Sequence, residues 1–173
     1  MKTIEQYIDT EMSGKITRKR NSPLPGLLVL AVGIAMWVLL CTADLGDSLS
    51  ATCLTVGLIA TALGLILTAM NLSGALTHFV YLPTRSRMKE KKVYISGDDY
   101  KDIADAITNE NLQPLATIRP VVSSNSAVRI LASRDGECAL LQAIRDQSGH
   151  FEPETDVRVL NGTAAAAIQH LIK

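Results

Sequence analysis

Four residues near the C-terminal end carry metal-binding side chains at alternating positions: His150, Glu152, Glu154 and Asp156. In an extended segment, alternate side chains point to the same side of the chain. Imidazole and carboxylate groups gathered there would form a candidate site for a divalent metal. The same pattern, with Pro153 among it, is typical of an exposed edge strand whose charges discourage unwanted pairing. We favour the edge strand and expect no metal and no other cofactor.

Three aspartates and one cysteine offer other chemistry. Asp98, Asp102 and Asp105 share one face of a predicted helix, where they would either hold a metal or form its solvated side. Cys138 could act as a nucleophile only beside a base in an electropositive pocket. The sequence has no phosphate-binding glycine loop, no paired-cysteine zinc spacing and no catalytic-triad spacing. We therefore name no catalytic residue and favour a protein that is not an enzyme.

Two long apolar runs dominate the N-terminal half, residues 24–43 and residues 49–72, and neither contains a charged side chain. A helix needs about 20 apolar residues to cross the hydrocarbon core of a bilayer. A core helix of a soluble protein would seldom be apolar on every face for so long. The sequence therefore predicts two transmembrane helices joined by a short extracytoplasmic turn at residues 44–48.

The distribution of charge predicts the orientation of this hairpin. Cytoplasmic flanks of membrane helices collect Lys and Arg, and here both outer flanks are basic while the turn carries only Asp44 and Asp47. We expect a multi-pass protein of a bacterial inner (plasma) membrane with both termini in the cytoplasm. A cleaved signal peptide is the alternative for the first run. The cations expected to contact lipid headgroups are Arg18, Lys19, Arg20, Arg85, Arg87, Lys89, Lys91 and Lys92.

The second apolar run carries a stripe of small and weakly polar residues. In membranes, helices associate where small residues let backbones approach. We expect the stripe to pack against the first helix of the same hairpin, with a seam between copies of the chain as the alternative. Cys41 and Cys53, at the outer helix ends, would form either a disulfide or two free thiols. The predicted helix-packing residues are Gly57, Thr61, Gly64, Thr68 and Asn71.

The segments flanking the hairpin have their own patterns. Residues 1–23 form an arm with a short amphipathic helix, in which Thr3 and Gln6 make a capping box. This helix is expected either on the membrane surface or on the C-terminal domain. Residues 73–92 are predicted to form an interfacial segment and a basic neck. The neck lacks interleaved aromatic side chains and leads into an acidic domain, so we expect no nucleic-acid binding.

Residues 93–173 are predicted to form a small cytoplasmic α+β domain, an antiparallel sheet with two helices on one face. Its clearest signal is a β-hairpin with Asp135 and Gly136 at the tip, which pairs Ile130 with Leu141 and leaves one face buried and the other mixed. Further strands are expected at residues 92–96, 114–122 and 154–160, and helices at residues 97–111 and 163–173.

These features predict a membrane-anchored, non-enzymatic protein. Its small cytoplasmic interaction domain would bind a protein partner or self-associate. One alternative is a membrane-tethered enzyme, or a sensor of a small ligand or metal, with its site in residues 93–173. Another is a component of a small transporter or channel, although neither apolar run has the ionisable groups that ion pathways usually need.

Overall fold

The computed structural model describes residues 1–43, 46–109, 111, 113–116 and 118–172. It divides into two compact units. Residues 19–78 form the helical unit, and residues 1–18 together with residues 79–173 form the head unit. The head unit is therefore assembled from both sides of the long helical insertion.

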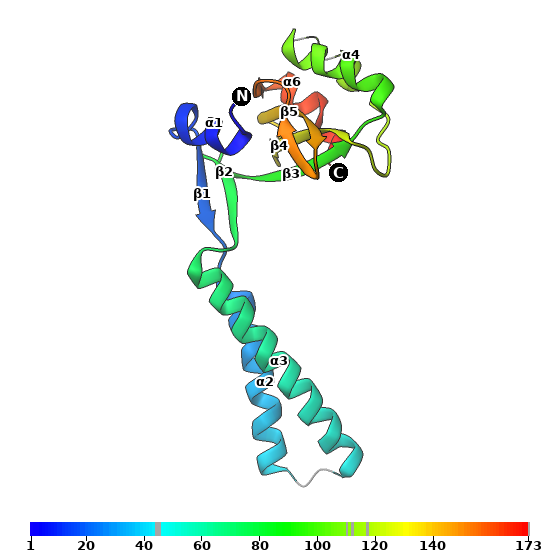
Figure 1. The fold of residues 1–173 in the computed structure, drawn as a ribbon. Helices are drawn as coiled ribbons and strands as arrows, with labels where there is room; N and C mark the ends of the chain where they lie inside the picture. The colour runs from blue at the N-terminus through cyan, green and yellow to red at the C-terminus, as the bar shows by residue number, and fades with distance from the viewer. Residues whose placement is uncertain (44–45, 110, 112, 117, 173) are drawn as a thin grey trace. The chain divides into compact units, whose positions relative to one another are not determined.

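The helical unit contains two long apolar helices, α2 (Leu24–Thr42) and α3 (Asp47–Ser73), which pack side by side as a hairpin (Figure 1). Both are apolar around their whole circumference, and large side chains such as Leu28 and Leu58 are exposed. α3 ends at Gly74, whose φ of 76° lies in the left-handed region that glycine adopts without strain. The predicted pair of long apolar helices is confirmed.

The head unit contains an antiparallel sheet that curls into a half-barrel, with strand order β1-β2-β3-β4-β5-β6 and with β7 also paired to β5. β1 and β2 each run across the boundary between the two units. The strands are β1 (Ile16–Arg20), β2 (Thr77–Tyr81), β3 (Ser86–Tyr94), β4 (Ser126–Ser133), β5 (Cys138–Gln147), β6 (His150–Pro153) and β7 (Arg158–Asn161).

The central hairpin of the sheet, β4 and β5, has the predicted register. Ile130 lies opposite Leu141 and Leu131 opposite Leu140. Gly136 at the tip has a φ of 78°, a conformation in which a side chain would be strained. The tight turn thus sets the alignment of every pair along the hairpin.

One face of the sheet is covered by α4 (Gly97–Thr108) and α6 (Thr163–Ala167), whose buried residues share one core with the strands. Asp98 and Asp99 lie in the first turn of α4, where carboxylates interact favourably with the helix dipole. Ile103 and Ile107 of α4, together with Ile168, pack in the core of this face.

The opposite face was predicted to be mixed, and this prediction is wrong. The N-terminal helix α1 (Ile4–Glu11) contributes Ile4 and Ile8 to a second core that contains Leu131, Cys138 and Leu140 of the central hairpin. Both faces of β4 and β5 are therefore buried, and the head has a helical layer on each side of the sheet. The N-terminal helix therefore packs on the head unit, which is one of the two positions predicted for it.

Four other elements differ from prediction. β3 begins at Ser86, six residues before the predicted residue 92, because Met88 joins the second core and draws the basic segment into the sheet. Within the described part of residues 114–122 there is no strand, and a short helix, α5 (Gln113–Ala116), occupies the start of this range. The last helix is divided into α6 and a 3₁₀ turn at Gln169–Leu171, and the strand expected at residues 154–160 is found at Arg158–Asn161.

Candidate interaction surface

The N-terminal helix is fixed by its own cap and by its packing. Thr3 Oγ1 accepts a hydrogen bond from the Gln6 backbone N–H at 3.3 Å, and the Gln6 side chain accepts one from the Thr3 N–H at 3.1 Å, so the predicted capping box is present. Such a cap satisfies two donors that the first helical turn leaves unpaired. Ile4 and Ile8, which are each 1% exposed, then anchor the capped helix to the sheet.

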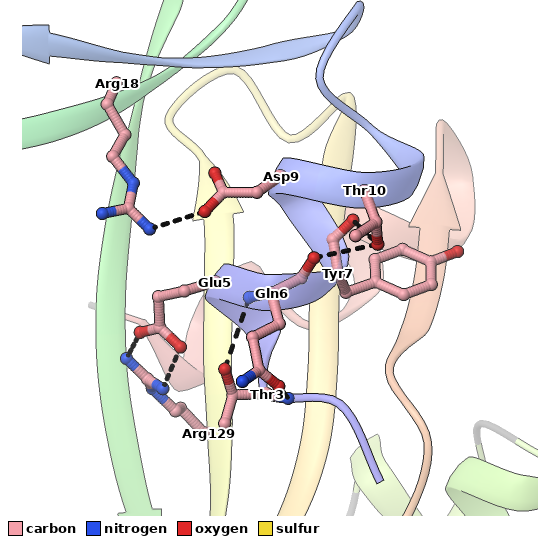
Figure 2. A network of polar contacts seen from close by, with 8 residues as sticks. All are labelled: Thr3, Glu5, Gln6, Tyr7, Asp9, Thr10, Arg18 and Arg129. Atoms are coloured by element: carbon pink, nitrogen blue, oxygen red, sulfur yellow. Dashed lines mark hydrogen bonds and ion pairs between the residues drawn. The ribbon is translucent and has the colours of Figure 1, made fainter.

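A charged network joins this helix to the strands (Figure 2). Arg129 on β4 donates from Nη1 to Glu5 at 3.0 Å, makes a second, shorter contact from Nη2 to the same carboxylate, and donates from Nε to Glu90 on β3 at 2.6 Å. The two contacts to Glu5 are the paired geometry in which a guanidinium binds a carboxylate most strongly. Arg129 thus connects three elements that are far apart in the sequence.

The ionisation of Glu5 responds to this environment. Burial raises the pKa of Glu5, but the hydrogen bonds and positive charge of Arg129 outweigh burial and the net shift is downward. A carboxylate whose pKa is lowered by folding stabilises the fold above its unfolded pKa, and this stabilisation is lost as the pH falls through its folded pKa. The head unit should therefore lose stability in the acid range below the usual glutamate pKa.

We expect Glu5→Gln to lower the melting temperature at neutral pH and to differ progressively less from the wild type as the pH enters that acid range. Thermal melts of the full-length protein in neutral detergent across this pH series measure the difference. Asp9→Asn is the matched control, since Asp9 pairs with Arg18 at 3.3 Å in a half-exposed geometry that contributes little. A Glu5→Gln effect that does not change with pH would contradict the role assigned to the carboxylate.

A buried side-chain amide also binds the N-terminal segment to the sheet. Gln142 on β5 is 1% exposed, and its Nε2 donates to the backbone oxygens of Lys2 at 2.7 Å and Thr155 at 3.0 Å. Glu5, Glu90 and Gln142 were not singled out by sequence reasoning. The one available signal was Gln142, because a polar residue in the middle of an apolar strand requires hydrogen-bond partners if it is buried.

All eight of the cations expected at lipid headgroups are exposed. Arg18 lies over the Phe79 ring at 5.2 Å as well as pairing with Asp9. Arg85 occupies a turn with a φ of 55°. On β3, Lys89 donates to the Ile172 carbonyl at 2.8 Å, and the Lys92 ammonium lies 3.6 Å from the centre of the Phe151 ring. Arg87, Lys89, Lys91 and Lys92 therefore line a single strand and form the β3 basic surface.

The predicted helix-packing stripe lies where α3 meets α2. A Cβ added to Gly64 would come within 2.5 Å of the Leu30 backbone, and one added to Gly33 would come within 2.4 Å of Thr61 Oγ1. The helices therefore approach so closely that only hydrogen fits at these positions. Gly57 and Asn71 are buried in the same unit, and Thr68 Oγ1 lies against Gly26. Cys41 and Cys53 are free thiols.

The candidate metal ligands do not converge. All four are exposed, and Glu154 also accepts a hydrogen bond from the Tyr100 hydroxyl at 2.7 Å and pairs with Arg145 at 3.4 Å. No group of three or more potential ligands occurs among the residues that the structure describes. As expected for an edge strand, β6 lies at one end of the sheet.

The other candidate residues have different settings. Asp98, Asp102 and Asp105 lie on the exposed side of α4. Cys138 is fully buried, and burial raises the pKa of its thiol to about 11, which keeps it protonated and weakly nucleophilic. Its backbone N–H donates to Ser133 Oγ at 3.0 Å. The geometry at Cys138 is that of a small apolar side chain in a core.

No protein-family model matches the chain, and no curated protein or solved structure is significantly similar to it.

Proposed function

We propose that this chain is a membrane-anchored, non-enzymatic interaction module. The helical unit spans a membrane as a two-helix hairpin, and the head unit lies on the cytoplasmic side, where it binds a protein partner. The observation that carries this proposal is the composition of the head. Its second core takes residues from both sides of the hairpin, so the segments before and after the helices must lie on the same side of any membrane that the hairpin crosses.

The surface of the hairpin supports its placement in lipid. Both helices are long and apolar enough to cross a bilayer, and only 11% of the most apolar stretch of each is buried. A helix that served as the core of a soluble protein would bury most of its large side chains. Exposed apolar surface of this extent is typical of contact with a membrane or with another protein.

The basic flanks support the cytoplasmic orientation. Lys19 and Arg20 precede α2, and the β3 basic surface follows α3, whereas no Lys or Arg occurs between residues 21 and 84. Retention of such cations on the cytoplasmic side determines the orientation of short membrane hairpins. The buried, protonated Cys138 and the dispersed acidic side chains favour binding over catalysis for the head.

The experiment that tests this function is cross-linking of the tagged, full-length protein in its own membrane, followed by mass spectrometry of the captured proteins. The control retains residues 19–78 but has a fluorescent protein in place of the head. We expect one or a few proteins to be enriched with the complete chain and lost with the control. Recovery of a lone monomer from both samples would contradict the proposal.

A further inference from the structure

The outer side of β3 has a stretch of backbone with no neighbouring strand. β4 pairs with β3 from Met88 to Tyr94, but β2 pairs only with Ser86 and Arg87. At the other end, the Val121 N–H donates to the Tyr94 carbonyl at 3.0 Å. Between these two points, β3 is paired on one side only.

The hydrogen bonds at the two ends of the β3–β4 ladder identify which backbone groups point outward. On the β4 side, the Arg87 carbonyl accepts from the Arg134 N–H at 3.1 Å, and the Ile95 N–H donates to Ser126 at 3.0 Å. Since backbone groups alternate in direction along a strand, the N–H and C=O of Glu90 and Lys92 face away from β4. Within the described chain, these four groups have no hydrogen-bond partner.

The side chains along this edge are predominantly cationic. Arg87, Lys89, Lys91 and Lys92 are all exposed, and none of them pairs with an acidic side chain of the described residues. The one acid on the strand, Glu90, is already paired with Arg129. The open edge therefore combines free hydrogen-bonding groups with positive charge that the head does not neutralise.

A second copy of this strand is a poor occupant of the edge. Antiparallel pairing of two β3 strands about Glu90 would place the two Glu90 side chains opposite each other and Lys89 opposite Lys91. Pairing about Lys91 would place the two Lys91 side chains opposite each other at the closer, non-hydrogen-bonded spacing. Like charges directly opposite are destabilising. The other edges of the sheet are no better: β1 is itself basic, and β6 contains Pro153, which has no N–H. Lysines on an edge discourage such self-pairing, but they attract a strand of opposite charge.

We propose that the outer edge of β3 binds an extended, acidic segment of a partner protein, which adds to the sheet as a further strand. The backbone of the segment pairs with Glu90 and Lys92, and its carboxylates lie beside the lysines. Strand addition of this kind takes its affinity from main-chain hydrogen bonds and its selectivity from the flanking side chains. The inference rests on the proposed function, because it assigns the partner of the same head unit.

The test uses the full-length protein in uncharged detergent and a fluorescent peptide of alternating Glu and Val residues. A peptide of alternating Lys and Val is its control. Two variants separate charge from backbone pairing. Lys92→Ala removes the charge. Lys92→Pro removes the charge together with the Lys92 N–H. The β3–β4 ladder does not use this N–H, so proline is tolerated there, as it is along an unpaired sheet edge. Thermal melts establish that both variants remain folded.

We expect the protein to bind the acidic peptide and not the basic one. Lys92→Ala should weaken binding of the acidic peptide modestly. Lys92→Pro should weaken it at least about tenfold further, because it also removes a main-chain hydrogen bond and disturbs the contacts beside it. Equal weakening by the two folded variants, or equal binding of both peptides, would overturn strand addition. So would binding of phosphatidylglycerol vesicles, but not of the acidic peptide, which would identify the edge as a lipid-contacting surface.

The partner captured by cross-linking distinguishes this inference from the proposed function. Loss of that partner in Lys92→Pro membranes, with retention in Lys92→Ala membranes, supports the β3 edge as the docking site. Unchanged capture in Lys92→Pro membranes would overturn the edge while leaving the proposed function intact. Failure to capture any partner with the wild-type protein would count against both.

Discussion

A fragment of residues 93–173 alone should fail to fold, whereas a chain that joins residues 1–20 to residues 77–173 through a short turn should fold cooperatively without the hairpin. The fragment lacks α1 and nearly all of β3, so one face and one edge of the central β4–β5 hairpin would be uncovered. The joined chain keeps every element of the head. It can be closed by a short turn, because the Asn21 N–H donates to the Leu76 carbonyl at 3.1 Å, which brings the ends of β1 and β2 together.

The size of the effect follows from the side chains that the N-terminal segment buries. Ile4, Ile8, Met12 and Ile16 are all at most 7% exposed. Burial of one large aliphatic side chain contributes about 1.5–3 kcal/mol, so the four contribute roughly 6–12 kcal/mol. This is comparable to the whole net stability of a typical domain, about 5–15 kcal/mol. Loss of the segment is therefore expected to unfold the head rather than merely to weaken it.

Circular dichroism and thermal melts of the two soluble chains measure this difference. Ile8→Ala in the joined chain serves as a graded control, with an expected loss of about 2–5 kcal/mol and a melting temperature lower by at least about 10 °C. If the fragment of residues 93–173 melts cooperatively at the temperature of the joined chain, the N-terminal helix is an accessory and not part of the core.

The features that sequence could predict are those with local causes. The register of β4 and β5 follows from the Asp135-Gly136 tip, because a short turn around these residues fixes which residues lie opposite. The long apolar helices follow from composition alone. The capping box at Thr3 and Gln6 follows from two residues three positions apart. Each of these depends on interactions within a few residues.

The features that sequence reasoning missed depend on contacts across the hairpin. Leu131, Cys138 and Leu140 are apolar residues on the face predicted to be mixed, and their partners are Ile4 and Ile8, more than a hundred residues earlier. No periodicity within residues 93–173 indicates that the covering layer comes from the N-terminus. The ion pair between Glu5 and Arg129 is hidden for the same reason.

The assignment of β3 failed for a different reason. Its exposed cations resemble a solvated basic neck, and its two buried residues, Met88 and Val93, are separated by four charged ones. A strand that is paired along nearly its whole length with β4 needs few apolar contacts, because much of its stability comes from that pairing. The open edge that we assign to a partner was therefore concealed by the same charges that would select that partner.

Both termini should be inaccessible from outside a spheroplast of a bacterial expression host, and the turn between α2 and α3 should be accessible. The reason is that α1 and β1 belong to the same folded unit as the strands that follow α3. Only an even number of crossings returns the chain to the side on which it began. A cleaved signal peptide would remove α1 and leave the second core of the head without Ile4 and Ile8.

Two single-cysteine additions make this expectation measurable. Ser48→Cys lies at the start of α3 and Ser123→Cys lies in the head, and both positions are exposed. A membrane-impermeant maleimide should label the first but not the second in intact spheroplasts, and should label both after lysis. Cys53 and Cys138 are buried and give little background, and the parent protein accounts for Cys41. The intact mass of the expressed protein should include α1, which cleavage of a signal peptide would remove.

Each possible failure has a distinct physical meaning. Labelling of Ser123→Cys but not Ser48→Cys from outside would mean that the flanking cations do not determine the orientation, although the head would still be assembled from both flanks. Labelling of both from outside would mean that the helices do not cross the membrane, and their exposed apolar surface would then require a protein partner. Protection of both would place the turn within the bilayer or on the inner side, and the two-crossing hairpin would be wrong. The expected pattern requires both the charge asymmetry and the shared core, which are independent properties of the chain.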